Sequence, residues 1–167
     1  MDVSWGLPFA AGAARYVYTS HCLEHLYLGD MLRTLREIHR VLADGGLVRI
    51  VVPDIEIYAR AYVAGQEAFF AERRRVWYWL PEGLPPLMTL LGYAGAGARP
   101  ADFTDTHKFG YDFATLAFLL RRVGFCEIRR SAYMSGQDEI LLLDHHSEVA
   151  GASYRDQHYS LFVEATK

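Results

Sequence analysis

The chain has 167 residues, of which 51% are hydrophobic and 22% charged, which is enough apolar material for one sizeable core but not for two. We therefore expect one domain over residues 1–167. The 17 Lys and Arg against 20 Asp and Glu give a net charge of -3, and without a basic cluster this excludes an electrostatic nucleic-acid partner. The longest uncharged stretch, residues 83–98, is interrupted by prolines and glycines and is too short for a membrane span.

The N-terminus and the cysteines point to one cellular environment. Residues 1–5 lack a basic region followed by an apolar run, so they predict no secretory signal. The two cysteines, Cys22 and Cys126, are isolated and give no disulfide framework. We expect a reducing, cytoplasmic location.

The first elements predict a βαβ unit. Residues 15–20 are rich in β-branched and aromatic side chains and predict a short strand. A helical period follows from Asp30, a reasonable N-cap, and is expected to stop at Gly45-Gly46, where glycine adopts a left-handed conformation at no cost. Residues 47–52 are almost continuously apolar, which is typical of a strand buried on both faces. Two strands joined by a helix predict parallel pairing and an α/β fold.

The second half predicts helices around an insertion. After Asp54 a long helical stretch leads to the charged run 72–75, which we interpret as a solvated helix face. Residues 81–105 are rich in proline and glycine and predict an irregular insertion or lid. A helix is predicted from Asp112 to Gly124. Strands are predicted over 125–134 and 159–165, with a loop or hairpin between 137 and 157.

One short pattern suggests a metal. Residues 21–25, His-Cys-Leu-Glu-His, match the H-x-x-E-H signature of one class of zinc peptidases. On a helix, His21 and His25 would share a face and bind Zn²⁺ while Glu24 activates the bound water. Such a site needs a helix of several turns, whereas here a strand ends at Ser20 and Gly29 restarts the chain soon afterwards. We predict no metal site and keep a zinc hydrolase as a weaker alternative.

A larger set of motifs is far more specific. In chain order they are Asp2, Gly6-Leu7-Pro8-Phe9, the strand 16–21, Leu23-Glu24-His25-Leu26, the helix 35–42, Gly45-Gly46, the strand end 50–54, and His107-Lys108-Phe109-Gly110-Tyr111-Asp112 with Val123-Gly124-Phe125. Together they resemble a class I S-adenosylmethionine-dependent methyltransferase of the methyltransferase type 11 group. The resemblance covers residues 2–54 and 107–130.

The resemblance implies a fold. This is a partial Rossmann-like doubly wound sheet, the C-terminal half of the class I fold, mostly parallel with one antiparallel strand. Residues 14–20 would be the family's fourth strand and 47–52 its fifth, and the last two strands would lie near Phe125 and Tyr159. Ligands of such sheets bind beyond the carboxyl ends of the strands.

The resemblance also implies S-adenosylmethionine as the cofactor. Asp2 and Leu7 match positions near the adenine. Ser20, His21 and Cys22 would face the cofactor and the acceptor.

A general base is needed if the acceptor loses a proton, and histidine titrates near neutral pH. His21, His25 and His107 are the candidates. Glu24 and His25 could equally have a structural role in the next helix, and His107 with Lys108 could equally be a surface turn.

This sequence departs from the family pattern at its start. The family's glycine-rich turn and the acidic residue that binds ribose precede the position of Asp2, so we expect the donor site to be incomplete in this chain. The strand 15–20 would then be a sheet edge, and we expect a homodimer or a partner chain to cover it. The predicted function is methyl transfer to a small-molecule acceptor. The alternative is a non-catalytic, methyltransferase-like dimeric or regulatory module.

Overall fold

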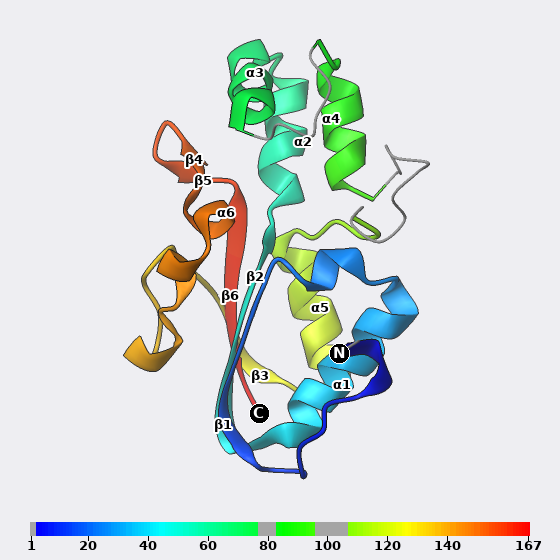
Figure 1. The fold of residues 1–167 in the computed structure, drawn as a ribbon, viewed down its shortest axis with the longest axis vertical. Coiled ribbons are helices and arrows are strands. Elements are labelled where there is room, and N and C mark those ends of the chain that lie inside the picture. The colour runs from blue at the N-terminus through cyan, green and yellow to red at the C-terminus, as the bar shows by residue number, and fades with distance from the viewer. Residues whose placement is uncertain (1–2, 77–82, 96–106) are drawn as a thin grey trace.

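A four-stranded sheet in the order β1-β2-β6-β3 forms the centre of the computed structural model, which describes residues 3–76, 83–95 and 107–167 (Figure 1). The strands are β1 (Ala14–Ser20), β2 (Leu42–Pro53), β3 (Cys126–Ser131) and β6 (Ser160–Thr166). β1 and β2 are parallel, whereas β6 runs antiparallel to both β2 and β3. One strand therefore opposes the others, and the predicted α/β fold with one antiparallel strand is confirmed.

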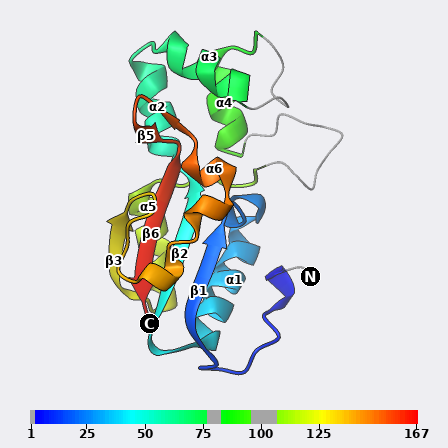
Figure 2. The ribbon, with the colours of Figure 1, turned by 60° about the vertical axis from the view of Figure 1, so that its left-hand side comes forward.

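Both faces of the sheet are covered, as Figure 2 shows. One face packs against α1 (Leu28–Val41) and α5 (Phe113–Val123), and the other against η3 (Glu139–Leu141), η4 (Asp144–His146) and α6 (Glu148–Gly151). Three helices lie beyond the carboxyl end of β2, namely α2 (Ile55–Val63), α3 (Glu67–Val76) and α4 (Pro86–Tyr93). The remaining elements are η1 (Val3–Trp5), η2 (Leu23–His25) and the hairpin of β4 (Ser153–Tyr154) and β5 (Gln157–His158). No described helix is long and apolar enough to cross a membrane.

β2 is buried on both faces, as its apolar sequence predicts. Val48, Ile50 and Val52 join the core formed with α1 and α5. Because side chains alternate along a strand, Arg49 and Val51 face the other layer, where Val51 packs with residues of α6 and β6. The sheet thus separates an apolar layer from one that contains a buried charge.

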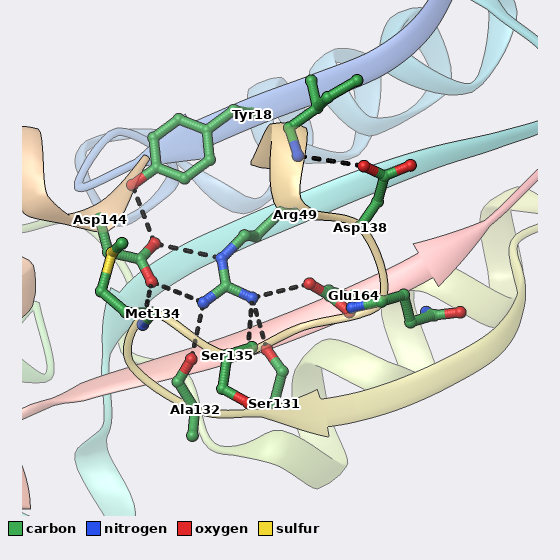
Figure 3. A network of polar contacts seen from close by, with 11 residues as sticks. Tyr18, Arg49, Ser131, Ala132, Met134, Ser135, Asp138, Asp144 and Glu164 are labelled. Atoms are coloured by element: carbon green, nitrogen blue, oxygen red, sulfur yellow. Dashed lines mark hydrogen bonds and ion pairs between the residues drawn. The ribbon is translucent and has the colours of Figure 1, made fainter. Parts of the chain in front are cut away.

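That charge is the guanidinium of Arg49, which is fully buried (Figure 3). Its Nη2 donates to Oδ2 of Asp144 at 2.6 Å, and its Nη1 to Oε1 of Glu164 at 2.7 Å. The hydroxyl of Ser131 and the carbonyl of Ala132 accept further bonds. Because the buried charges are paired and bonded, the network holds the segment after β3 against the sheet.

The first helix differs from its prediction at both ends. α1 has Tyr27 as its N-cap, so Asp30 lies in the first turn, and the helix ends at Val41, before Gly45-Gly46. Leu42 is fully buried and already extended, pairing with Ala14. Burial of Leu42 in the core therefore starts β2 before the glycines. Gly45 and Gly46 lie inside this strand, where the register of its pairing with β1 shifts.

The long helix expected after Asp54 is two helices, α2 and α3, which separate around Gly65 (φ 62°). The interpretation of residues 72–75 as a solvated face is wrong for Arg73, which is 1% exposed. Its guanidinium lies 4.2 Å from the ring centroid of Tyr159. Glu72 and Arg75 do form a surface ion pair.

The predicted insertion at 81–105 contains a regular helix, α4, which starts after Pro85 because proline suits a first helical turn. Residues 81–82 and 96–105 lie outside the described part of the chain. The helix predicted from Asp112 is confirmed, since that side chain accepts from the N–H of Thr115 at 2.7 Å and Gly124 ends α5 with φ 116°. The strands near Phe125 and Tyr159 are also confirmed, as β3 and β6, and so is a hairpin before β6.

Candidate functional site

The candidate site begins where β1 ends. After Ser20 the chain turns at His21, which has a left-handed backbone (φ 48°) and donates its N–H to the carbonyl of Val51 at 2.9 Å. The Nε2 atom of His21 lies 3.1 Å from Oγ of Ser160, the first residue of β6. This imidazole is therefore held over the carboxyl ends of β1 and β2.

Glu24, in η2, is the buried centre of the site, with 1% of its surface exposed. Its Oε1 lies 3.1 Å from Nδ1 of His21 and 3.9 Å from Nε2 of His25. Neither carboxylate oxygen meets the geometry of a hydrogen bond with any described residue. A buried carboxylate in this state is costly, so a cationic or hydrogen-bonding partner would stabilise it.

His107 approaches the same carboxylate from a distant part of the sequence. Its Nδ1 lies 3.2 Å from the carbonyl oxygen of Tyr93, the last residue of α4. Its ring packs edge-on against His25, with 5.0 Å between centroids. Burial lowers the pKa of His107 to about 4, against the opposing effect of the Glu24 charge. The imidazole is therefore neutral near pH 7.

Backbone contacts fix this approach. The N–H groups of Lys108 and Phe109 donate to the carbonyl of Glu24 at 2.6 and 3.2 Å. The buried hydroxyl of Tyr111 donates to the carbonyl of Leu23 at 3.1 Å. Residues 107–111 and η2 thus form one unit, in which four side chains meet: His21, Glu24, His25 and His107. We call these four residues the His–Glu cluster.

The structure brings together some of the predicted site residues and separates others. The three candidate bases all belong to the His–Glu cluster. Cys22 is the N-cap residue of η2, and burial and the charge of Glu24 raise the pKa of its thiol. Leu7 instead packs against the core, and its N–H donates to Glu37 of α1 at 3.0 Å. Asp2 lies outside the described residues.

The helix required by the zinc-peptidase interpretation is a single 3-10 turn, Leu23–His25. Within the described part of the chain, the group whose ligand atoms gather within 4.8 Å of one another is Glu24, His25 and His107, not the expected pair His21 and His25 with a catalytic Glu24. The spacing H-x-x-E-H pointed to this region. Nothing in the local sequence could show that His107 would complete the group.

The comparisons with known proteins bear on the fold. The family model described as a methyltransferase domain matches residues 1–50. The single antiparallel strand, β6, also corresponds to the sheet that the resemblance implies. The chain has the class I methyltransferase fold.

Solved methyltransferases share this fold at low identity. One from Archaeoglobus fulgidus superposes with a TM-score of 0.53 at 14% identity, over 100% of this chain and 65% of its own. One from Thermotoga maritima, described as a possible histamine N-methyltransferase, superposes with a TM-score of 0.51 at 16% identity. The match covers 98% of this chain and 61% of that protein. One from Mesorhizobium loti superposes with a TM-score of 0.51 at 17% identity, and the match covers 100% of this chain and 67% of that protein. The first two show that the chain spans about three fifths of such methyltransferases. No curated protein matches.

Proposed function

We propose that the chain takes part in S-adenosylmethionine-dependent methyl transfer to a small-molecule acceptor, with the His–Glu cluster on the acceptor side. The observation that carries the proposal is the convergence of His21, His25 and His107 just beyond the carboxyl end of β1, where ligands of doubly wound sheets bind. The family match and the activities named for the similar structures support the same reaction class.

The cofactor supplies an electrophilic methyl group on a sulfonium. When bound, it would donate this methyl group to the acceptor's lone pair, with S-adenosylhomocysteine as the leaving group. The protein holds the acceptor in line, excludes water and removes a proton when the acceptor carries one. His21 suits proton removal best, because the carboxylate of Glu24 lies 3.1 Å from its Nδ1 and stabilises the imidazolium that forms. His107, with its pKa lowered to about 4, suits orientation of the acceptor. His25, whose side chain is 31% exposed, forms the solvent side.

The donor side rests on residues carried over from the family, namely Asp2, Leu7, Ser20, His21 and Cys22. Among these five residues, Ser20, His21 and Cys22 at the end of β1 are the ones that lie at the His–Glu cluster, and β1 is the edge of the described sheet. We propose that further protein, from the same or a partner chain, completes the donor site. In this proposal residues 1–167 act as one domain, with residues around 81–105 as its lid. The two free cysteines are in keeping with a cytoplasmic location.

The test is calorimetric titration of S-adenosylhomocysteine into the 167-residue chain. We expect micromolar binding when the completing protein is also present and, at 100-fold excess over Kd, about 2.7 kcal/mol of added stability. Ser20→Leu adds bulk at the end of β1 and should weaken binding at least tenfold, whereas Ser153→Leu, the same change on the exposed hairpin, should not. Absence of binding, also after addition of a completing partner, contradicts the proposal.

The open edge of β1 favours a second candidate, a non-catalytic dimeric or regulatory module. Within the described sheet β1 pairs with β2 alone. The N–H and C=O groups along the other side of an edge strand can pair with a strand of a second chain. This candidate predicts a homodimer by light scattering and no thermal shift with S-adenosylhomocysteine. A dimer that binds the nucleoside would reject this candidate and leave the methyl-transfer proposal standing.

A further inference from the structure

We propose that Glu24, His25 and His107 bind one divalent transition-metal ion, with Zn²⁺ as the ion that the site fits best. Their ligand atoms, one from each residue, all lie within 4.8 Å of one another. These residues belong to the His–Glu cluster of the proposed function, but the inference concerns ion binding and can be tested without cofactor or acceptor, so its failure can be distinguished from a failure of methyl transfer.

The donor set has the chemistry that the ion requires. Two imidazoles and one carboxylate form the protein part of open zinc sites, in which water takes the fourth position. Tetrahedral Zn²⁺ with ligands at about 2.1 Å holds its donor atoms about 3.4 Å apart. The three side chains therefore need to close by little more than an ångström. Since His25 is 31% exposed, the ion has a route from solvent.

The burial of Glu24 is the second, independent observation. Only 1% of the surface of Glu24 is exposed. Neither carboxylate oxygen has a hydrogen bond among the described residues. A cation beside it removes that cost. Among the described ion pairs of Glu24, the shorter is with His21, whose Nδ1 lies 3.1 Å from Oε1.

The surroundings of His107 prepare it as a ligand. Its Nδ1 lies 3.2 Å from the carbonyl oxygen of Tyr93, an acceptor that places the proton on Nδ1 and leaves the lone pair on Nε2. Carbonyl partners of this kind orient metal-binding histidines and fix their tautomer. His25 presents its Nε2 to Oε1 of Glu24 at 3.9 Å, and its buried Nδ1 has no hydrogen-bond partner among the described residues.

The experiment uses the full chain, stripped of metal with a chelator and titrated with ZnCl₂ in a calorimeter. We expect one ion per chain. His107→Asn and His25→Asn should each weaken binding by at least about 100-fold, the upper end of the loss seen when only outer partners of a metal ligand are removed. The matched control is His145→Asn with His146→Asn, because this adjacent pair is exposed and is the competing place for adventitious zinc.

A second measurement keeps the test decisive if a variant binds weakly for structural reasons. Glu24→Gln keeps the size of the side chain and removes its charge. Without metal, this variant should melt at the same or a higher temperature than the parent, because an unsatisfied buried charge is gone. With Zn²⁺ the order should reverse, since the variant loses a ligand. Co²⁺ should give the parent, and not the variant, the visible absorption of a tetrahedral site.

The proposal is overturned if the parent binds no zinc, or if binding disappears in the control double variant and persists in His107→Asn. It is also overturned if Glu24→Gln melts below the parent equally with and without Zn²⁺, because the carboxylate would then have a structural role alone.

Discussion

Arg49 and Asp144 form an ion pair with no exposed side-chain surface, in which Nη2 donates to Oδ2 at 2.6 Å. Glu164 accepts from the same guanidinium at 2.7 Å. Arg49→Met should lower the free energy of unfolding by about 3–5 kcal/mol, because two carboxylates lose their buried counter-charge. Urea unfolding measures the loss.

The control for this prediction is Arg60→Met, which removes a surface pair with Glu56. Exposed pairs contribute between about 0 and 1 kcal/mol, so this variant should unfold nearly as the parent does. Equal losses in the two variants would mean that the buried network contributes no more than a surface pair.

Gly95 touches the backbone that carries His107. A Cβ atom there would lie 2.6 Å from the carbonyl carbon of Lys108, and its φ of +91° disfavours other residues. Gly95→Ala should cost about 1–3 kcal/mol through overpacking and backbone strain. Gly29→Ala is the matched change, since nothing lies within 4 Å of its site in α1, and it should be neutral or stabilising by up to about 1 kcal/mol. Thermal melts that show no difference between the two variants would contradict the close approach.

Tyr111 anchors η2 through one hydrogen bond, from its buried hydroxyl to the carbonyl of Leu23. Tyr111→Phe should cost about 1 kcal/mol, the usual net value of such a bond. Tyr27→Phe serves as the comparison, because that side chain is 62% exposed and should change little. Chemical denaturation of both variants tests this, and a neutral Tyr111→Phe would show that the bond does not stabilise the site.

Glu37 makes stability depend on acid pH. The hydrogen bonds from the Arg40 side chain and the Leu7 backbone lower the pKa of its carboxyl to about 2 from the ordinary 4.5. A folded-state pKa below the unfolded value gives a stabilisation that is present above pH 4.5 and disappears as pH falls toward 2. Glu37→Gln should therefore show a shallower loss of melting temperature over that range. An unchanged slope in the variant would count against the pairing.

Local patterns were sufficient for much of the fold. The apolar strand 47–52 and the caps Asp112 and Gly124 follow from side-chain chemistry close in sequence, because helix caps and strand burial depend on neighbouring residues. The resemblance to class I methyltransferases added the single antiparallel strand, which the structure confirms as β6.

Helix ends and buried charges depended on contacts that sequence patterns do not contain. α1 stops at Val41 because Leu42 is buried against the core, although a glycine pair follows three residues later. Arg73 is buried against the rings of Tyr93 and Tyr159, unlike its neighbours Glu72 and Arg75. In both places tertiary burial outweighs local preference, which is a weak determinant for any single residue.

By itself the sequence determined the α/β class, the order of the main elements and the three histidines of interest. Only the tertiary structure decided that Glu24 is their buried centre and that His107, more than 80 positions from Glu24 along the chain, joins His25 there. The reason is physical. The backbone bonds from residues 108 and 109 to the carbonyl of Glu24 close a long loop, and such a closure is stabilised by the packing of the whole fold rather than by any local pattern.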